Sequence, residues 1–134
     1  MNIYSATVSD RMHHLDLGLF CYQVNFTYEV LKIQHGDALV DEVNHRLAAI
    51  PRFPELKIFS NGLHARLTAG EYRNIMKVML FVVDNLYNEN DDDVDNFVYN
   101  DDLTELYEKW NEMYMISRYE EFSEGDLAKF KVSK

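Results

Sequence analysis

The most apolar stretch of the sequence lies between Thr68 and Tyr87, TAGEYRNIMKVMLFVVDNLY. Its hydrophobic positions recur at steps of three and four residues, which is the period of one face of an α-helix. Thr68 and Glu71 have the spacing of a capping box, in which each side chain binds a backbone N–H at the start of a helix. The pattern predicts a helix from Thr68 to about Tyr87 that is the most buried element of the fold. Its apolar positions are Tyr72, Ile75, Met76, Met79, Val82, Val83 and Leu86.

Two amphipathic helices are predicted before this stretch. Apolar residues recur at helical spacing in residues 15–34, and Gly36 is a natural stop because glycine favours the backbone conformation that ends a helix. Asp37 can cap a second helix that runs through Ile50, because a carboxylate at this position accepts a hydrogen bond from a backbone N–H that has no partner within the helix. Pro51 should end that helix, since proline has no N–H to donate.

The remaining segments are an irregular connection, an acidic loop and a C-terminal helix. Residues 51–67 contain two prolines and the turn signal Ser-Asn-Gly at 60–62. Residues 88–102 are acidic, and Asp102 or a neighbour should cap the helix that follows. Residues 1–9 suit a short strand, and the tail from Ser123 suits one more turn of helix. The predicted apolar face of the C-terminal helix consists of Leu103, Leu106, Tyr107, Trp110, Met113 and Tyr114.

Composition agrees with a folded, mainly helical chain. At 134 residues the sequence has the length of one domain, and 47% of the residues are hydrophobic. We therefore predict a mainly α-helical single domain, residues 1–134, with four or five helices and at most a short N-terminal strand. Within it, residues 103–134 form the C-terminal helices.

Charge and cysteine content restrict the classes of partner. The formal net charge is −10, with 13 Lys and Arg against 23 Asp and Glu, so a broad surface for a nucleic-acid backbone is not expected. The central apolar stretch is too short and too interrupted by polar residues to cross a membrane. The single cysteine, Cys21, cannot form an internal disulfide, and the N-terminus shows no secretory leader. We therefore expect an intracellular protein without a membrane partner.

An ordered set of motifs begins at residue 9. The string SDRMHHLDLGLF is followed by NHRLAAIPRFPELKIFSNGLHARLTAGEYRNIMKVM. In order, it contains Asp-x-x-His, an Asp-Leu-Gly helix entry, Ile-Pro-x-x-Pro, a Phe-x-x-Gly turn and Thr-x-x-Glu. Over residues 9–87 this set resembles the middle of the catalytic region of Kyakuja-Dileera-Zisupton and Plavaka-type transposases, which have an RNase H-like core.

The resemblance implies a role for two residues. In that family, three acidic residues hold two divalent cations for phosphoryl transfer at DNA ends, and carboxylates are ligands that Mg²⁺ prefers. The Asp-x-x-His motif corresponds to Asp10 and His13. Asp10 would be a metal ligand and a catalytic residue, and His13 would position the DNA strand or the leaving oxygen beside it. A nuclear location would follow from such a function.

The sequence also departs from the family pattern. It opens nine residues before Asp10, whereas the family's first catalytic aspartate lies upstream of this motif, and the final acid is expected further downstream. Leu67 stands where the family commonly has tryptophan. We therefore expect a truncated or domesticated transposase fragment that is catalytically inactive alone, binds no Mg²⁺ or other cofactor, and pairs with a second copy or with a longer transposase relative.

Several of these residues also have simpler structural interpretations. His13, His14 and Asp16 have the composition of a metal cluster, but adjacent histidines at a helix start usually cap, hydrogen-bond or face water. Glu71 is explained by the capping box and need not be a catalytic acid. Cys21 lies in a predicted helix, where a free cysteine usually packs as a small hydrophobic residue.

The acidic loop supports an alternative function, calcium binding. With Asp91 as position one of a twelve-residue EF-hand-like loop, Asp93, Asp95 and Asp102 fall at positions three, five and twelve. Position six is Asn96 instead of glycine, and the last ligand is Asp instead of Glu. Acidic runs between helices are also common as solvated linkers. Residues 91–102 therefore carry a partial calcium-loop pattern.

A third interpretation is a helical protein-interaction module. Its binding surface would be the face formed by Tyr107, Trp110 and Tyr114, which would be uncovered if the rest of a transposase were absent. This function needs no metal, and a measurement of molecular size tests it.

Overall fold

The described part of the chain is mainly α-helical. The computed structural model describes residues 12–54, 56, 62–63, 67–88, 96–119, 121 and 123–132. These residues form a π-helix and five α-helices, and no strand is found among them. The predicted N-terminal strand at residues 1–9 lies outside the described residues. None of the helices in the described segments combines the length and apolar character needed to cross a membrane.

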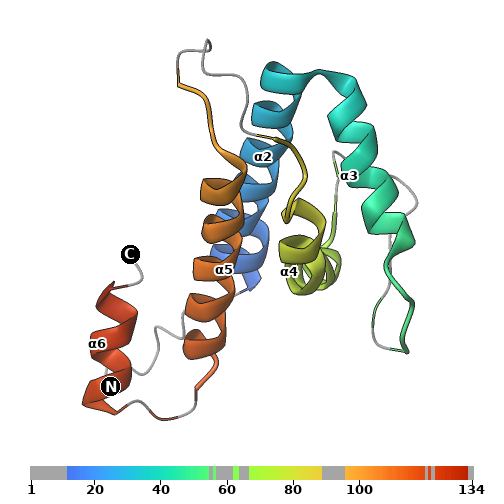
Figure 1. Ribbon diagram of the computed structural model, residues 1–134. Coiled ribbons are helices and arrows are strands. Elements are labelled where there is room, and N and C mark those ends of the chain that lie inside the picture. Colours follow the sequence, from blue (N-terminus) through green and yellow to red (C-terminus); the bar gives the residue numbers. More distant parts are fainter. Residues whose placement is uncertain are drawn as a thin grey trace. The chain divides into compact units, whose positions relative to one another are not determined.

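The chain divides into two compact units, Met1–Val78 and Met79–Lys134, and the boundary falls within one helix. The first unit contains η1 (Met12–Leu19), α2 (Phe20–His35), α3 (Asp37–Ala49) and the first part of α4 (Ala69–Val83). The second unit contains the end of α4, then α5 (Asn100–Ser117) and α6 (Glu124–Val132). Figure 1 labels the five α-helices.

The helix predicted for residues 15–34 consists of two segments with different geometry. Its first part is the π-helix η1, which is continuous with α2. A Cβ atom on Gly18 would lie 2.8 Å from the carbonyl oxygen of His13, so the close backbone packing of η1 at this point requires glycine. The spacing of apolar residues does not distinguish a π-helix from an α-helix here, because over eight residues both geometries place the same residues on one face.

Gly36 ends α2, as predicted, and the chain then reverses direction into α3 (Figure 1). Gly36 has φ = 76°, a conformation that favours glycine, and its N–H donates to the carbonyl of Lys32 at 3.0 Å. The predicted cap by Asp37 is wrong. Asp37 is the first residue of α3, and no side-chain hydrogen bond caps this helix. Its carboxylate lies 3.6 Å from Lys32 Nζ, and a negative charge in the first turn is favourable to the helix dipole.

The end of α3 agrees with the sequence pattern. The helix ends at Ala49, and Ile50 is extended with ψ = 129°, which is the conformation that a following proline favours. Asn44 within α3 accepts a hydrogen bond from the Leu63 N–H at 2.9 Å and so holds the predicted turn at Gly62, whose φ is 77°. The rest of that turn signal, residues 60–61, lies outside the described residues.

Helix α4 is the most buried of the described helices, as predicted. Eight of its fifteen residues are buried, against five of the sixteen in α2. It ends at Val83, however, and not near Tyr87. Asn85 has φ = 47°, and such a left-handed residue ends an α-helix. The eight buried residues are Ala69, Tyr72, Ile75, Met76, Val78, Met79, Val82 and Val83.

In the second unit, Asn100 joins the two ends of the acidic loop. Its Oδ1 accepts hydrogen bonds from the N–H groups of Leu86 at 3.0 Å and Tyr87 at 3.3 Å. The Tyr87 hydroxyl donates to the Val98 carbonyl at 2.8 Å, and the Tyr87 ring packs edge-on against Phe97. Residues 86–87 are thus fixed to residues 97–100, while most of the acidic loop between them lies outside the described residues.

Helix α5 begins earlier than predicted. It starts at Asn100, so Asp102 lies inside the first turn and is not the cap. Of the predicted apolar face, Leu103 and Tyr107 are buried, but Leu106 is 39% exposed. The tail forms the nine-residue helix α6, which is longer than the single turn predicted. Ser123 and Asp126 cap α6 reciprocally, with the Ser123 N–H donating to Asp126 Oδ2 at 2.9 Å and the Asp126 N–H donating to Ser123 Oγ at 3.2 Å.

Candidate functional site

The residues implied by the resemblance lie at or before η1. Asp10 and the side chain of His14 are outside the described residues, so the predicted pairing of Asp10 with His13 stays a prediction. His13 lies in η1 and is exposed. Among the described residues, no three His, Cys, Asp or Glu side chains come together as a group that could hold a metal ion.

Asp16 is the buried acid of this region. Its side chain is only 3% exposed, and Oδ2 lies 3.1 Å from Nε of Arg73 on α4. Arg73 is half-exposed, and its Nε also donates to the Ala69 carbonyl at 3.4 Å. A carboxylate held by a guanidinium group is neutralised by it, which makes Asp16 a poor ligand for a cation. Asp16 thus forms an ion pair between η1 and α4, whereas a cluster of His13, His14 and Asp16 stays untested because the His14 side chain is outside the described residues.

A second polar contact joins the same two segments. The Tyr72 hydroxyl donates a hydrogen bond to Cys21 Sγ at 3.0 Å, and the Tyr72 ring packs edge-on against Phe20 with ring centroids 6.2 Å apart. Burial, and then the hydrogen bond to Cys21, raise the pKa of the Tyr72 hydroxyl above its ordinary value. The predicted role of Cys21 as a buried packing residue needs correction. Cys21 is half-buried, and its sulfur also accepts a longer hydrogen bond from Asn25 Nδ2 at 3.6 Å.

Thr68 and Glu71 form the predicted capping box at the start of α4. The Thr68 N–H donates to Glu71 Oε2 at 2.6 Å, and the Glu71 N–H donates to Thr68 Oγ1 at 3.3 Å. The carboxylate of Glu71 is thus used by the helix start, which confirms the structural interpretation of this residue.

The chemistry available to this group of residues is limited. Tyr72 with a raised pKa is a weak proton donor, and Asp16 is held by Arg73, so neither is suited to transfer a proton near neutral pH. Cys21 receives hydrogen bonds but has no histidine or lysine described beside it to activate the thiol. The arrangement is best suited to fixing η1 and the start of α2 onto the first half of α4.

Sequence reasoning missed the contacts that define this group. The sequence pattern relates Asp16 only to its neighbours and places Tyr72 on an apolar face. Arg73 is one of the polar residues that interrupt the central apolar stretch. No local pattern connects Asp16 with Arg73, because 57 positions separate them. Only the motif order, in which the Asp-Leu-Gly entry precedes Thr-x-x-Glu, relates the two segments.

The described part of the acidic loop has two features of a calcium loop. Asn96, at position six, has φ = 62°, which is the type of conformation that glycine provides there in an EF-hand. Asp102, at position twelve, is exposed in the first turn of α5. Asp91, Asp93 and Asp95 lie outside the described residues, so their arrangement as ligands stays a prediction.

The predicted interaction face on α5 is partly covered. Tyr107 is fully buried, and Trp110 and Tyr114 are half-buried. Exposed hydrophobic side chains lie elsewhere on this helix, at Leu106 and Met115. The interaction face named from the sequence is therefore not the exposed surface of α5.

Comparisons with protein-family models, with curated proteins and with solved structures gave no match.

Proposed function

We propose that the chain is a fragment of the middle of a transposase catalytic region and has no strand-transfer activity of its own. The observation that carries the proposal is the contact between Asp16 and Arg73. Asp16 belongs to the Asp-Leu-Gly motif and Arg73 to the helix that begins with Thr-x-x-Glu. The Asp-Leu-Gly motif and the helix that begins at Thr-x-x-Glu thus lie together in one unit, as motifs of one catalytic region would.

The motif residues have structural roles that explain why such a fragment would retain them. Gly18 allows the close backbone packing of η1, Glu71 caps α4 and Gly62 forms the turn held by Asn44. None of these roles requires a metal. A fragment that keeps its fold but not its reaction would therefore still carry them.

The expectation of inactivity follows from the number of carboxylates. Two cations on either side of a phosphate need several carboxylates brought together, and the resemblance assigns only Asp10 to that role here. The net charge of −10 also repels the DNA that must enter such a site.

A nuclease assay tests the lack of activity. We expect the full chain to give no cleavage or joining of DNA above background in Mg²⁺ or Mn²⁺, with Asp10→Asn identical to the parent. Asp41→Asn, an exposed acid on α3, is the matched control. Cleavage that is lost in Asp10→Asn and kept in Asp41→Asn would show that a working site exists and would refute this part of the proposal.

The genomic DNA around the reading frame tests the origin. We expect terminal inverted repeats or a decayed upstream segment encoding the family's first aspartate. An intact, unrelated gene structure on both sides, without such remnants, would argue against a transposon origin even if the nuclease assay were negative.

A further inference from the structure

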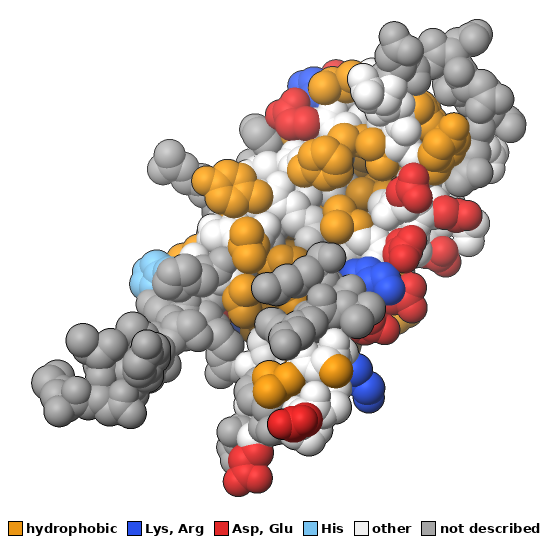
Figure 2. Space-filling model, turned by 90° about the vertical axis from the view of Figure 1, so that its left-hand side faces the viewer, with side chains coloured by type: hydrophobic (Ala, Val, Ile, Leu, Met, Phe, Trp, Pro, Cys, Tyr) orange, Lys and Arg blue, Asp and Glu red, His pale blue; other side chains and the backbone are white. Residues whose placement is uncertain are grey.

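The whole net charge of the chain is concentrated in its second unit. Residues 79–134 contain 15 Asp and Glu against five Lys and Arg, whereas residues 1–78 contain eight of each. The first unit is therefore formally neutral, and the second has a formal charge of −10. Figure 2 shows one face of the molecule on which exposed hydrophobic side chains lie next to acidic ones.

Part of this charge forms a stripe along α5. Asp101, Glu105, Glu108 and Glu112 follow one another at steps of four, three and four residues, which places them on the same side of the helix, and all four are exposed. We call these residues the acidic stripe. At 1.5 Å per residue it extends about 16 Å, or three helical turns. Within it, Lys109 approaches Glu105 only to 3.9 Å, with both side chains more than half exposed, so this pair neutralises little of the charge.

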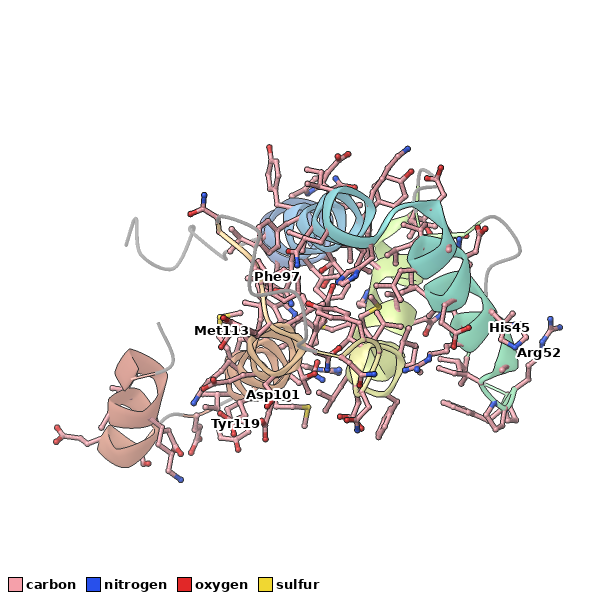
Figure 3. All side chains as sticks on the ribbon, turned by 45° about the horizontal axis from the view of Figure 1, so that its top comes forward. His45, Arg52, Phe97, Asp101, Met113 and Tyr119 are labelled. Atoms are coloured by element: carbon pink, nitrogen blue, oxygen red, sulfur yellow. The ribbon has the colours of Figure 1, made fainter. Side chains whose placement is uncertain are left out.

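The stripe continues into a hydrophobic groove. Met115 and Tyr119 follow Glu112 at the same spacing and are 60% and 48% exposed. In Figure 3, Asp101 and Tyr119 lie on the same side of α5, whereas Met113 lies on another. Met115 and Tyr119 line an open groove of about 930 Å³ between α5 and α6, together with Leu80 and Ile116. The charged residues that line it are three acids, Glu108, Glu112 and Asp126, and two lysines, Lys109 and Lys129.

We propose that the acidic stripe and this groove together bind a basic amphipathic helix of a partner protein. Lysine or arginine residues at helical spacing would face the four carboxylates, and a large apolar side chain of the partner would enter the groove at Met115 and Tyr119. A second copy of this chain is a poor occupant, because two units of charge −10 repel each other. The binding surface includes neither Asp10 nor His13 and so does not depend on the transposase origin.

The probe is a fluorescein-labelled 18-residue peptide of lysine and leucine arranged as an amphipathic helix, titrated with the full chain and followed by fluorescence anisotropy. We expect saturable binding that weakens as salt is raised. The triple variant Glu105→Gln/Glu108→Gln/Glu112→Gln should bind about tenfold more weakly, since exposed charge pairs each contribute modestly.

A variant with the same net charge distinguishes binding by the acidic stripe from attraction of the basic peptide to the overall negative charge of the protein. Asp84→Asn/Glu121→Gln/Glu124→Gln removes three exposed acids from the same unit without touching the stripe, and it should bind the peptide within about twofold of the parent. Equal weakening by the two triple variants would show that only net charge matters and would overturn the proposal, as would an absence of binding.

The groove is tested separately. Met115→Ser should weaken binding about fivefold, because it removes an exposed apolar contact. A lysine and serine peptide of the same length and charge should bind at least about tenfold more weakly than the lysine and leucine peptide. Binding that is insensitive to both changes would refute the role of the groove. Concentration-dependent dimerisation that blocks the peptide would assign this surface to a second copy instead.

Discussion

The side chain of Asn100 should be one of the most stabilising polar groups in the second unit. It is 4% exposed, and its Oδ1 accepts the Leu86 and Tyr87 N–H groups while its Nδ2 donates to Thr104 Oγ1 at 3.4 Å. Asn100→Ala removes these hydrogen bonds, so the Tyr87 N–H loses Oδ1 as its acceptor and the Leu86 N–H keeps only its second acceptor, the Val83 carbonyl at 3.2 Å. Because Leu86 is buried, water cannot easily replace the oxygen at its N–H.

The cost can be estimated from the two donors. The buried Leu86 N–H keeps the Val83 carbonyl as an acceptor, so losing Oδ1 there costs about 0.5–1.5 kcal/mol, the net value of one hydrogen bond, and the half-buried Tyr87 N–H, which water can reach, adds about 0.5 kcal/mol. We therefore expect Asn100→Ala to lower the free energy of unfolding by about 1–2 kcal/mol. For a chain of this length the midpoint of thermal unfolding should fall by about 5 °C.

The assay is urea and thermal unfolding followed by circular dichroism at 222 nm. Asn88→Ala changes an exposed asparagine nearby and should be neutral within about 0.5 kcal/mol.

A clear outcome would refute the reasoning. If Asn100→Ala and Asn88→Ala have the same stability, the joining of the two loop ends by Asn100 contributes nothing measurable.

Three further predictions concern other parts of the chain. Gly18→Ala should destabilise the protein by about 1–3 kcal/mol, because the new Cβ would meet the His13 carbonyl oxygen. Gly70→Ala, whose Cβ would have no atom within 4 Å, should stabilise it by about 0.5–1 kcal/mol. Equal effects of the two substitutions in chemical unfolding would contradict this prediction. Because folding raises the pKa of Tyr72, this residue contributes stability that is fully present below the ordinary pKa of 10 and is lost as the pH rises above it. An absorbance titration at 295 nm should therefore show one tyrosine that ionises at higher pH than the others and that is absent in Tyr72→Phe. A titration that is unchanged in Tyr72→Phe would argue against the raised pKa. Calorimetry should detect only weak, salt-sensitive Ca²⁺ binding by the acidic loop at millimolar concentration, and saturable micromolar binding lost in Asp93→Ala would contradict this expectation.

The features that sequence could predict are those fixed by residues within one helical turn. The capping box of Thr68 and Glu71, the helix stop at Gly36 and the end of a helix before Pro51 all depend on neighbours within four positions, and all three are confirmed. The mainly helical fold follows from the same local periodicity. Such features depend on the conformational preferences of neighbouring residues and on hydrogen bonds between them, so the residue types within a short window are enough to predict them.

The contacts missed are those between segments far apart in the chain. Periodicity placed Tyr72 on an apolar face, which is correct for its ring, but it says nothing of the hydroxyl that reaches Cys21. The predicted end of α4 is too late, because the apolar pattern continues to Leu86 although the helix ends at Val83 and Asn85 has a left-handed backbone conformation. Leu86 is buried beyond the end of the helix, where its N–H donates to the Val83 carbonyl at 3.2 Å and to Asn100 Oδ1 at 3.0 Å, and the second of these contacts cannot be read from local sequence.

The π-helix η1 makes the direction in which His13 points depend on the backbone geometry of this segment. A π-turn is closed by hydrogen bonds between residues five positions apart instead of four, so it takes in about one more residue than an α-turn for the same rotation. Deleting one residue within η1, C-terminal to His13, would therefore allow a continuous α-helix that keeps His13 on the same side relative to α2. Converting the same residues into an α-helix without a deletion would instead turn His13 by about 100° around the axis, the rotation of one residue. The side of the helix on which His13 lies is thus set by the number of residues in each turn of η1.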